Sequence, residues 1–329
     1  MQDPTQEEWE NLWSQANGGI YQSWKWIELH KKLGRNIKFI IERDKSGRLN
    51  AGLSFIESNL KTPLGTKKIL RASGNPLSYN DDTTLSFLKE LKNEVKNYFY
   101  CAISPLVILP REDLFNKAGY KIFLNYTILI ELNKEKDELW KQLEKKSARW
   151  GIKIAEKNSL KFELAEKPED LEIFYELYTK TTKKGNFHLN EKYFIDGLKN
   201  TNLSKMFLIK LKNEVLAGGL ILLDYNNKIA VLNLTSSSDK GLKLQAMPFL
   251  YWNIILYCKS LNFAFFDLGG YDAEAAKDTK EYNINKFKER FGGRIIEQPV
   301  FSTNWKYPLL RKSMQKMRFL KKIYKKLNY

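Results

Sequence analysis

The chain has few side chains of the kinds that bind metals or act as nucleophiles. Its only histidines are His30 and His188, and its only cysteines are Cys101 and Cys258. These residues lack the spacing of a zinc ligand set, and they poorly support a hydrolase in which histidine activates serine or cysteine. Both cysteines lie in apolar patterns, which is typical of small buried residues in a reducing compartment. We therefore expect no metal site.

A regular row of cations is the clearest chemical feature. The spacing of apolar residues predicts one long helix from about Asp137 to Asn158. Its opposite face carries a cation at every fourth position: Lys141, Lys145, Arg149, Lys153 and Lys157. Such a row repels itself unless an anion lies against it. The row is therefore a candidate phosphate-binding ridge. The alternative is a solvated face whose repulsion is softened by Glu138 and Glu144.

Asp267 ends a strongly apolar predicted strand, FAFFDLGG. The ends of strands in α/β sheets are common places for functional residues. The carboxylate could therefore orient a reacting group, although a helix-capping or turn role would explain it equally well. Ser236 and Ser237, in a serine-rich segment, offer hydroxyl groups, but serine is common in turns.

The elements that would position these residues occur twice. Residues 37–57 and 205–224 each predict a β-hairpin. Residues 114–130 and 287–302 each predict a short helix closed by glycine and followed by two strands. Two matched pairs in the same order indicate an internal duplication.

A helix and a strand separate the matched segments in each copy. The first copy has a helical pattern at residues 82–97, followed by the strand YCAISPLVIL. In the second copy, Pro248 suits the first turn of a helix that runs to about Ser260. This order is that of a GNAT-type acyltransferase domain. The fold class is therefore α/β (α+β), with two duplicated GNAT-like domains and a C-terminal basic helix.

A chain of 329 residues is longer than one hydrophobic core usually supports. We expect a first domain over residues 1–145, completed by the C-terminal segment 305–329, and a second domain over residues 146–304. The N-terminus lacks the pattern of a signal peptide, and no apolar run approaches the roughly 18 residues of a membrane span. We expect a cytoplasmic protein.

The net charge of +17 favours anionic partners. From Trp305 onward the chain has nine Lys or Arg residues and no acid. Residues 308–327 predict an amphipathic helix with these cations around its apolar stripe. Such a helix could lie on the inner face of a membrane as a peripheral contact, bind a tRNA backbone, or dock on the first domain with its cations solvated.

Several segments resemble the Fem-type transferases that build peptidoglycan interpeptide bridges. They are YQSWKWIELHKKLG at 21–34, the basic segment LWKQLEKKSARWGIKIAEKN, FYELYTKTTKKGNF at 174–187, residues 234–270, and FKERFGG at 287–293. The resemblance runs from about Tyr21 to Trp305. It implies transfer of an amino acid from aminoacyl-tRNA to an amine of a UDP- or lipid-linked muramyl-peptide precursor.

The resemblance also implies roles for individual residues. Lys288 matches a lysine at the family's reaction centre, and Asp267 could orient it. The residues expected to bind the acceptor are Gln22, Ser23, Trp26, His30, Lys31, Ser236 and Ser237. Those expected to bind tRNA phosphates are Lys141, Lys145, Arg149 and Lys153. Residues 187–192 lack the arginine with which some members hold a UDP-linked acceptor, and Ser104 replaces an acid common before Pro105.

Acetyl-CoA is disfavoured as a donor because GNAT enzymes hold its pyrophosphate on a glycine-rich loop at a helix N-terminus. The corresponding segments here, residues 80–83 and 243–248, contain no glycine. Two alternatives remain open. One is an N-acyltransferase that uses an acyl thioester on a polysaccharide or small-molecule amine. The other is a non-catalytic basic protein that binds RNA or a membrane.

Overall fold

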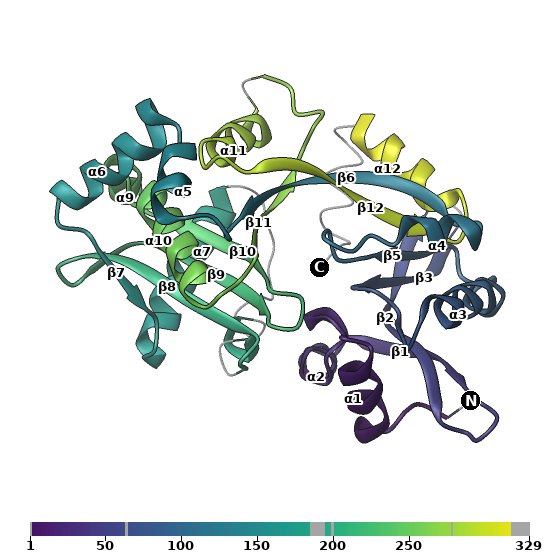
Figure 1. Ribbon diagram of the computed structural model, residues 1–329. Coiled ribbons are helices and arrows are strands. Elements are labelled where there is room, and N and C mark those ends of the chain that lie inside the picture. Colours follow the sequence, from purple (N-terminus) through teal and green to yellow (C-terminus); the bar gives the residue numbers. More distant parts are fainter. Residues whose placement is uncertain (1, 63–64, 185–194, 199–200, 278, 317–329) are drawn as a thin grey trace. The chain divides into compact units, whose positions relative to one another are not determined.

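The computed structural model describes residues 2–62, 65–184, 195–198, 201–277 and 279–316 (Figure 1). The chain forms two compact units. Residues up to Asn125 and from Glu297 onward make the first, and Tyr126–Ile296 make the second. The chain passes from one unit to the other within strands β6 (Lys121–Glu131) and β12 (Arg294–Ser302). These boundaries fall before the expected ones at residues 145 and 304.

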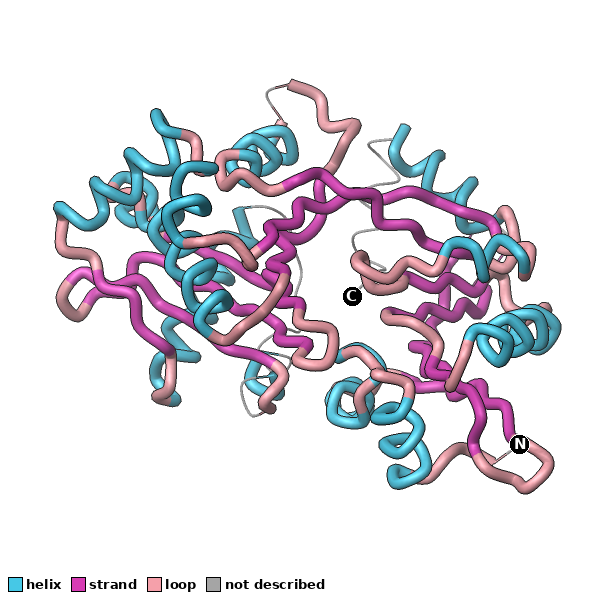
Figure 2. Tube along the Cα trace, viewed as in Figure 1, coloured by secondary structure: helices cyan, strands magenta, loops and turns pink. Residues whose placement is uncertain are grey.

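The first unit combines a sheet with helices that lie against it (Figure 2). Its helices are α1 (Gln6–Gln15), η1 (Ile20–Gln22), α2 (Trp24–Lys32), α3 (Asp81–Glu94), α4 (Glu112–Lys117) and α12 (Lys306–Lys316). Its other strands are β1 (Asn36–Arg43), β2 (Leu49–Thr62), β3 (Gly65–Ser73), β4 (Leu77–Ser78) and β5 (Cys101–Ser104). The strand order is β1-β2-β3-β5-β12, and β4 also pairs with β2.

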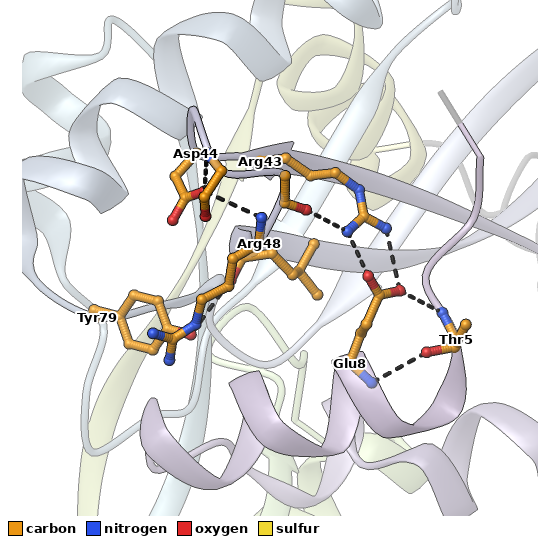
Figure 3. Close-up of polar contacts among 9 residues, drawn as sticks. Thr5, Glu8, Arg43, Asp44, Arg48 and Tyr79 are labelled. Atoms are coloured by element: carbon orange, nitrogen blue, oxygen red, sulfur yellow. Dashed lines mark hydrogen bonds and ion pairs between the residues drawn. The ribbon is translucent and has the colours of Figure 1, made fainter.

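Strands β1 and β2 form the first expected hairpin, with antiparallel pairing from Asn36–Glu57 to Arg43–Leu49. In the turn, the Asp44 carboxylate accepts hydrogen bonds from the backbone N–H groups of Ser46 and Arg48. Figure 3 shows how α1 is tied to this hairpin: Glu8 accepts two hydrogen bonds from the Arg43 guanidinium, at 2.5 and 3.1 Å. Arg43 and the Thr5 backbone lower the pKa of Glu8 to about 2.

The second unit is a mixed sheet with helices packed against it. Its helices are α5 (Lys136–Gln142), the π-helix η2 (Lys145–Arg149), α6 (Trp150–Lys157), α7 (Pro168–Lys184), α9 (Asp239–Lys243), α10 (Ala246–Ser260) and α11 (Lys280–Glu289). Its strands are β7 (Lys161–Leu164), β8 (Ser204–Leu211), β9 (Glu214–Asp224), β10 (Ile229–Ser237) and β11 (Phe265–Tyr271), in the order β6-β11-β10-β9-β8-β7. Strands β8 and β9 form the second expected hairpin.

The core of the second unit surrounds α10. This helix is apolar on most of its circumference, and Leu250, Ile254 and Cys258 are fully buried in it. They pack with residues of the sheet and of the α5–α6 segment in one continuous cluster. The start of α10 puts Pro248 in its first turn, as the sequence predicts. A helix that is buried on most sides needs no polar face.

Three element predictions were wrong. Each short helix with a glycine exit leads into one long strand, β6 or β12, and not into two. The strand expected over YCAISPLVIL is only β5, Cys101–Ser104. The long basic helix is broken, because Leu143 and Glu144 have extended backbones with ψ values of 139° and 123°. Leu143 is buried in the core. We infer that burying this side chain stabilises the chain more than continuing the helix through it would.

None of the helices in the described part of the chain is both long enough and apolar enough to cross a membrane.

Candidate active site

Lys288 lies in the last turn of α11 and is almost fully buried, with 9% of its surface exposed. Its ammonium donates hydrogen bonds to the carbonyl oxygens of Gly269 and Gly270, at 3.0 and 2.8 Å. A lysine is rarely buried without a carboxylate in direct contact. Here two backbone dipoles hold the cation at the end of β11.

An irregularity in β11 supplies those two carbonyl groups. Strand β11 pairs with β6 at Asp267–Leu129 and next at Gly270–Thr127, so that it carries one extra residue between the pairs. Gly269 within this bulge has a φ of +75°, in the left-handed region. Bulges are over-represented next to active sites. They redirect groups that would otherwise form the regular hydrogen bonds between strands.

Asp267 is buried just before the bulge. Its carboxylate accepts a hydrogen bond from the Thr127 hydroxyl on β6 and one from the Gly269 N–H, at 2.8 Å in the latter case. Burial raises the pKa of Asp267, although both hydrogen bonds and the Lys288 charge act in the opposite direction. Burial likewise lowers the pKa of Lys288 to about 8, against the attraction of Asp267. The Lys288 ammonium therefore loses its proton at a lower pH than an exposed lysine does.

Two further contacts fix α11 in front of β11. The Asn285 side chain accepts a hydrogen bond from the Asp272 N–H and donates one to the Asp272 carbonyl, at 3.2 and 2.7 Å. Phe287 and Phe291 pack on the ring of Tyr251 from α10, with ring centroids 5.1 and 4.9 Å apart. These contacts set the direction from which Lys288 approaches the sheet.

The two glycines after α11 allow close packing as well as the helix exit. A methyl group at Gly292 would lie 2.7 Å from both Cβ and the carbonyl oxygen of Gln142. One at Gly293 would lie 2.5 Å from Cγ2 of Ile128. Beside them, the Glu144 N–H donates to the Arg290 carbonyl at 2.8 Å. The end of the Lys288 helix is thus in direct contact with the segment between α5 and η2.

The parallel pairing of β10 with β11 covers only Ile229–Val231 with Phe265–Asp267, although β10 continues to Ser237 and β11 to Tyr271. The Lys288 ammonium lies just beyond the last paired residue of β11, on the carbonyls of Gly269 and Gly270. A cation in such a position can stabilise negative charge that develops on a bound carbonyl group. The arrangement is suited to acyl transfer.

Residues 113–210, from α4 to β8, match the model of the FemAB family. The matched segment is 98 of the 329 residues of the chain.

Solved structures share the fold of this chain. FemX is 16% identical with a TM-score of 0.73, over 94% of this chain and 98% of that one. L-PGS from Bacillus licheniformis is 17% identical with a TM-score of 0.62, over 94% of both chains. The C-terminal domain of a proposed lysylphosphatidylglycerol synthetase from Agrobacterium fabrum is 13% identical with a TM-score of 0.63, over 94% and 95%. No curated protein matches the chain. The expected α/β fold class is confirmed.

Gln22 and Ser23 make their contacts inside the first unit. The Gln22 amide donates to the carbonyls of Ser54 and Ser73 and accepts from the Ser54 N–H. Ser23 caps α2 by accepting from the Trp26 N–H, at 3.3 Å, and its hydroxyl donates to the Ile20 carbonyl. Both side chains are buried. These contacts brace the start of α2.

Trp26, His30 and Lys31 follow on α2. The Trp26 ring packs edge-on against His30, with centroids 4.9 Å apart. Burial and the Arg35 charge lower the pKa of His30 to about 3, so its imidazole is neutral at pH 7 and adds no charge for a phosphate. Lys31 is exposed, with its ammonium 5.1 Å from the centre of the Trp24 ring. Lys31 is therefore the only cation among the α2 residues expected to bind the acceptor.

Ser236 and Ser237 lie at the end of β10. Ser236 is buried and donates to the Leu177 carbonyl at 2.9 Å, and Ser237 donates to the Leu216 carbonyl at 3.3 Å. Ser237 also lines a pocket of about 320 Å³. Charged residues of that pocket are Glu176, Lys180, Glu214 and Asp239. Ser236 therefore has an internal role, whereas Ser237 borders a space that a ligand could enter.

The cations of the joining segment lie on three elements because the predicted helix is broken. Lys141 is on α5, Lys145 and Arg149 are in η2, and Lys153 is on α6. All belong to the same unit as Lys288. Glu144, expected to soften the row, accepts a hydrogen bond from Ser147 and lies 3.8 Å from the Arg290 guanidinium.

Sequence reasoning missed Thr127 and Asn285, and its placement of Trp150 on the apolar face of the joining helix was wrong, because Trp150 is 53% exposed. Thr127 is far from Asp267 along the chain, and only the β6–β11 pairing brings them together. Asn285 is one turn of α11 before Lys288, so its position on the same helical face could have marked it. Trp150 lies among the cations of the basic segment and could have been noted beside them.

Proposed function

We propose that this protein is an aminoacyltransferase of the FemAB type, which transfers an amino acid from aminoacyl-tRNA to the peptide amine of a UDP- or lipid-linked muramyl-peptide precursor of the cell wall. The observation that carries the proposal is Lys288, a buried cation held by the carbonyls of Gly269 and Gly270 beside Asp267. Because aminoacyl-tRNA is a cytoplasmic donor, the reaction would take place in the cytoplasm.

The donor ester is already activated, so the protein mainly has to align the reactants and stabilise the intermediate. The acceptor amine attacks the ester carbonyl carbon, and a C–N bond forms. The tetrahedral intermediate carries its negative charge on the former carbonyl oxygen, and the Lys288 ammonium stabilises it. The C–O bond to the tRNA ribose then breaks, and the amine proton ends on the departing ribose oxygen, through water or the substrate.

Asp267 acts in this scheme through Lys288. Its carboxylate attracts the Lys288 ammonium and accepts a hydrogen bond from the Gly269 N–H. This hydrogen bond fixes the bulge whose carbonyl groups bind Lys288. The carboxylate is buried and already accepts two hydrogen bonds, one of them from Thr127. We therefore propose that Asp267 positions Lys288 and keeps it protonated.

We assign direct contact with the acceptor to Lys31 and Trp26 on α2 and to Ser237 at its pocket. The buried side chains among the expected acceptor residues hold these elements in place. They are Gln22, Ser23, His30 and Ser236. The C-terminal segment supports contact with a membrane-bound acceptor. Leu309 is 62% exposed at the start of α12, whereas Tyr307 is buried and Leu310 packs on the first unit. The rest of the predicted 308–327 helix lies outside the described residues from residue 317 onward.

A second candidate acceptor is a phospholipid headgroup. It is favoured by the fold shared with L-PGS and with the domain named for lysylphosphatidylglycerol synthesis. The basic C-terminal segment also suits an anionic lipid. The donor and the role of Lys288 would be the same in both reactions.

The test is transfer of radiolabelled amino acids from charged total tRNA to UDP-linked muramyl pentapeptide, lipid-linked muramyl pentapeptide and phosphatidylglycerol vesicles. We expect incorporation that RNase abolishes and that Lys288→Met reduces by at least 100-fold, the order found when one oxyanion-stabilising donor is removed. Lys286→Met is the matched control, because Lys286 is exposed on the same helix and pairs with Glu289. Acetyl-CoA turnover on an amine, with no transfer from tRNA, would refute the proposal.

A further inference from the structure

Trp150 is an exposed tryptophan at the first position of α6. It exposes 53% of its surface, whereas Gly151 and Ile152 immediately after it are buried. Gly151 explains the orientation: a methyl group there would lie 3.0 Å from the Gln245 and Pro248 side chains, so the start of α6 packs tightly on the start of α10. The large ring of Trp150 is left on the outside of this contact.

The surroundings of Trp150 are strongly basic. Residues 145–157 contain five cations and one acid, Glu156. The cations are Lys145, Lys146, Arg149, Lys153 and Lys157. None of them forms an ion pair with another residue of the described part of the chain. A cluster of unneutralised cations favours a polyanionic partner.

The apolar face of the same segment is already used. Ala148, Ile152 and Ala155 are each at most 1% exposed and belong to the core of the second unit. A helix that binds a membrane surface needs an apolar face free to enter the lipid. A single aromatic ring among cations instead suits a single-stranded nucleic acid, whose bases stack on the ring while its phosphates meet the cations. RNA is therefore favoured over a membrane.

The residues directly before this segment contact the end of the helix that carries Lys288. Gln142 lies against Gly292, and the Glu144 N–H donates to the Arg290 carbonyl. The π-helical turn η2 begins directly after Glu144 and leads to Trp150. Turns of this type are frequent at functional sites. The proposed RNA surface therefore follows directly, along the chain, the residues that contact the end of α11.

We propose that the η2–α6 surface, residues 145–157, binds the single-stranded end of the RNA donor, with one nucleobase stacked on Trp150. The inference rests on the proposed function, since it takes aminoacyl-tRNA as the donor. It adds the part of the tRNA that is recognised and a residue that recognises it.

The test is equilibrium binding of the full-length protein to two fluorescent RNA hairpins, one with a four-nucleotide single-stranded 3′ end and one that is blunt. Loss of a stacked base costs about 1–3 kcal/mol, so Trp150→Ala should weaken binding of the first hairpin about 5- to 150-fold. Trp150→Phe should retain most of the affinity. Trp305→Ala, which removes a tryptophan exposed to 56% beside Lys306, is the matched control and should change nothing.

Salt dependence separates stacking from charge. Trp150→Ala should leave the slope of log affinity against log salt unchanged, whereas Lys153→Ala should reduce it by about 0.7 to 0.9. The inference is overturned if Trp150→Ala binds both hairpins as the parent protein does. It is also overturned if the variant loses affinity for phosphatidylglycerol vesicles alone.

These binding measurements need no catalysis, so the two proposals can fail separately. Trp150-dependent RNA binding without aminoacyl transfer would support the surface and refute the reaction. Transfer that proceeds in Trp150→Ala with an unchanged KM for tRNA would support the reaction and refute the surface.

Discussion

Lys288 carries its charge where protein has replaced most of the water. Burial lowers the pKa of its ammonium to about 8, and Asp267 limits that fall. If the ammonium stabilises the oxyanion, activity requires the protonated form. The activity should then be present below this pKa and be lost as the pH rises through about 8.

This dependence gives a prediction for Asp267→Asn. Removal of the carboxylate charge should lower the pKa of Lys288 further, so the alkaline limb of the pH–rate profile should move to lower pH. Thr127→Val should move the limb in the same direction by less, because it removes only a hydrogen bond to the carboxylate. The measurement is kcat/KM from pH 6 to 10. A limb that stays in place in both variants would exclude the coupling.

Ser23 provides a second prediction at this scale. It caps α2, and loss of such a cap costs about 1 kcal/mol. Ser23→Ala should therefore lower the free energy of unfolding in urea by that amount and leave KM for the acceptor unchanged. A raised KM at unchanged stability would instead assign Ser23 direct contact with the acceptor.

At the scale of elements, α11 and the α5–η2 junction act together because Gly292 lets them touch. Gly292→Ala introduces a methyl group 2.7 Å from Gln142 at a φ of +76°. Left-handed strain costs about 1–2 kcal/mol, and the clash adds about 1–3 kcal/mol. We expect lower stability and a reduced kcat/KM, because α11 must shift.

Gly34→Ala is the control for that variant. Gly34 has a φ of +72°, but no atom lies within 4 Å of the added methyl group. The stability of Gly34→Ala should fall only by the cost of the left-handed strain, and its kcat/KM should be unchanged. Equal losses of activity in the two variants, measured in the same transfer assay, would argue against coupling between α11 and the junction.

At the scale of the whole molecule, the C-terminal part of the chain completes the first unit. Phe301 on β12 is fully buried and stacks on Phe115, with ring centroids 4.0 Å apart. Tyr307 and the partly buried Leu310 join a second cluster of the same unit. Docking of the start of the tail on the first unit is therefore observed, although the prediction placed the return of the chain only at residue 305.

Phe301→Ala should destabilise the protein by about 3–5 kcal/mol, as expected for truncation of a buried aromatic side chain. The measurement is urea unfolding followed by near-ultraviolet circular dichroism. Leu309→Ala, at an exposed position of α12, should stay within about 0.5 kcal/mol of the parent protein. A small effect of Phe301→Ala would show that the first unit is stable without β12.

The sequence by itself determined the local features of this protein. Hydrophobic periodicity and glycine positions predicted both hairpins, α3, α10 and the glycine exits of α4 and α11, because these depend on residues close together in the chain. The family resemblance singled out Lys288, and the predicted strand end at Asp267 marked a carboxylate that could orient it.

Only the tertiary structure decided what those residues contact. The bulge at Gly269, the hydrogen bond from Thr127 to Asp267 and the packing of Gly292 on Gln142 join strands and helices that are distant in sequence. The break at Leu143 has the same origin, since burial of one side chain in the core prevails over helical periodicity. Local patterns carry no information on such contacts, because the energies that fix them arise only when the elements pack.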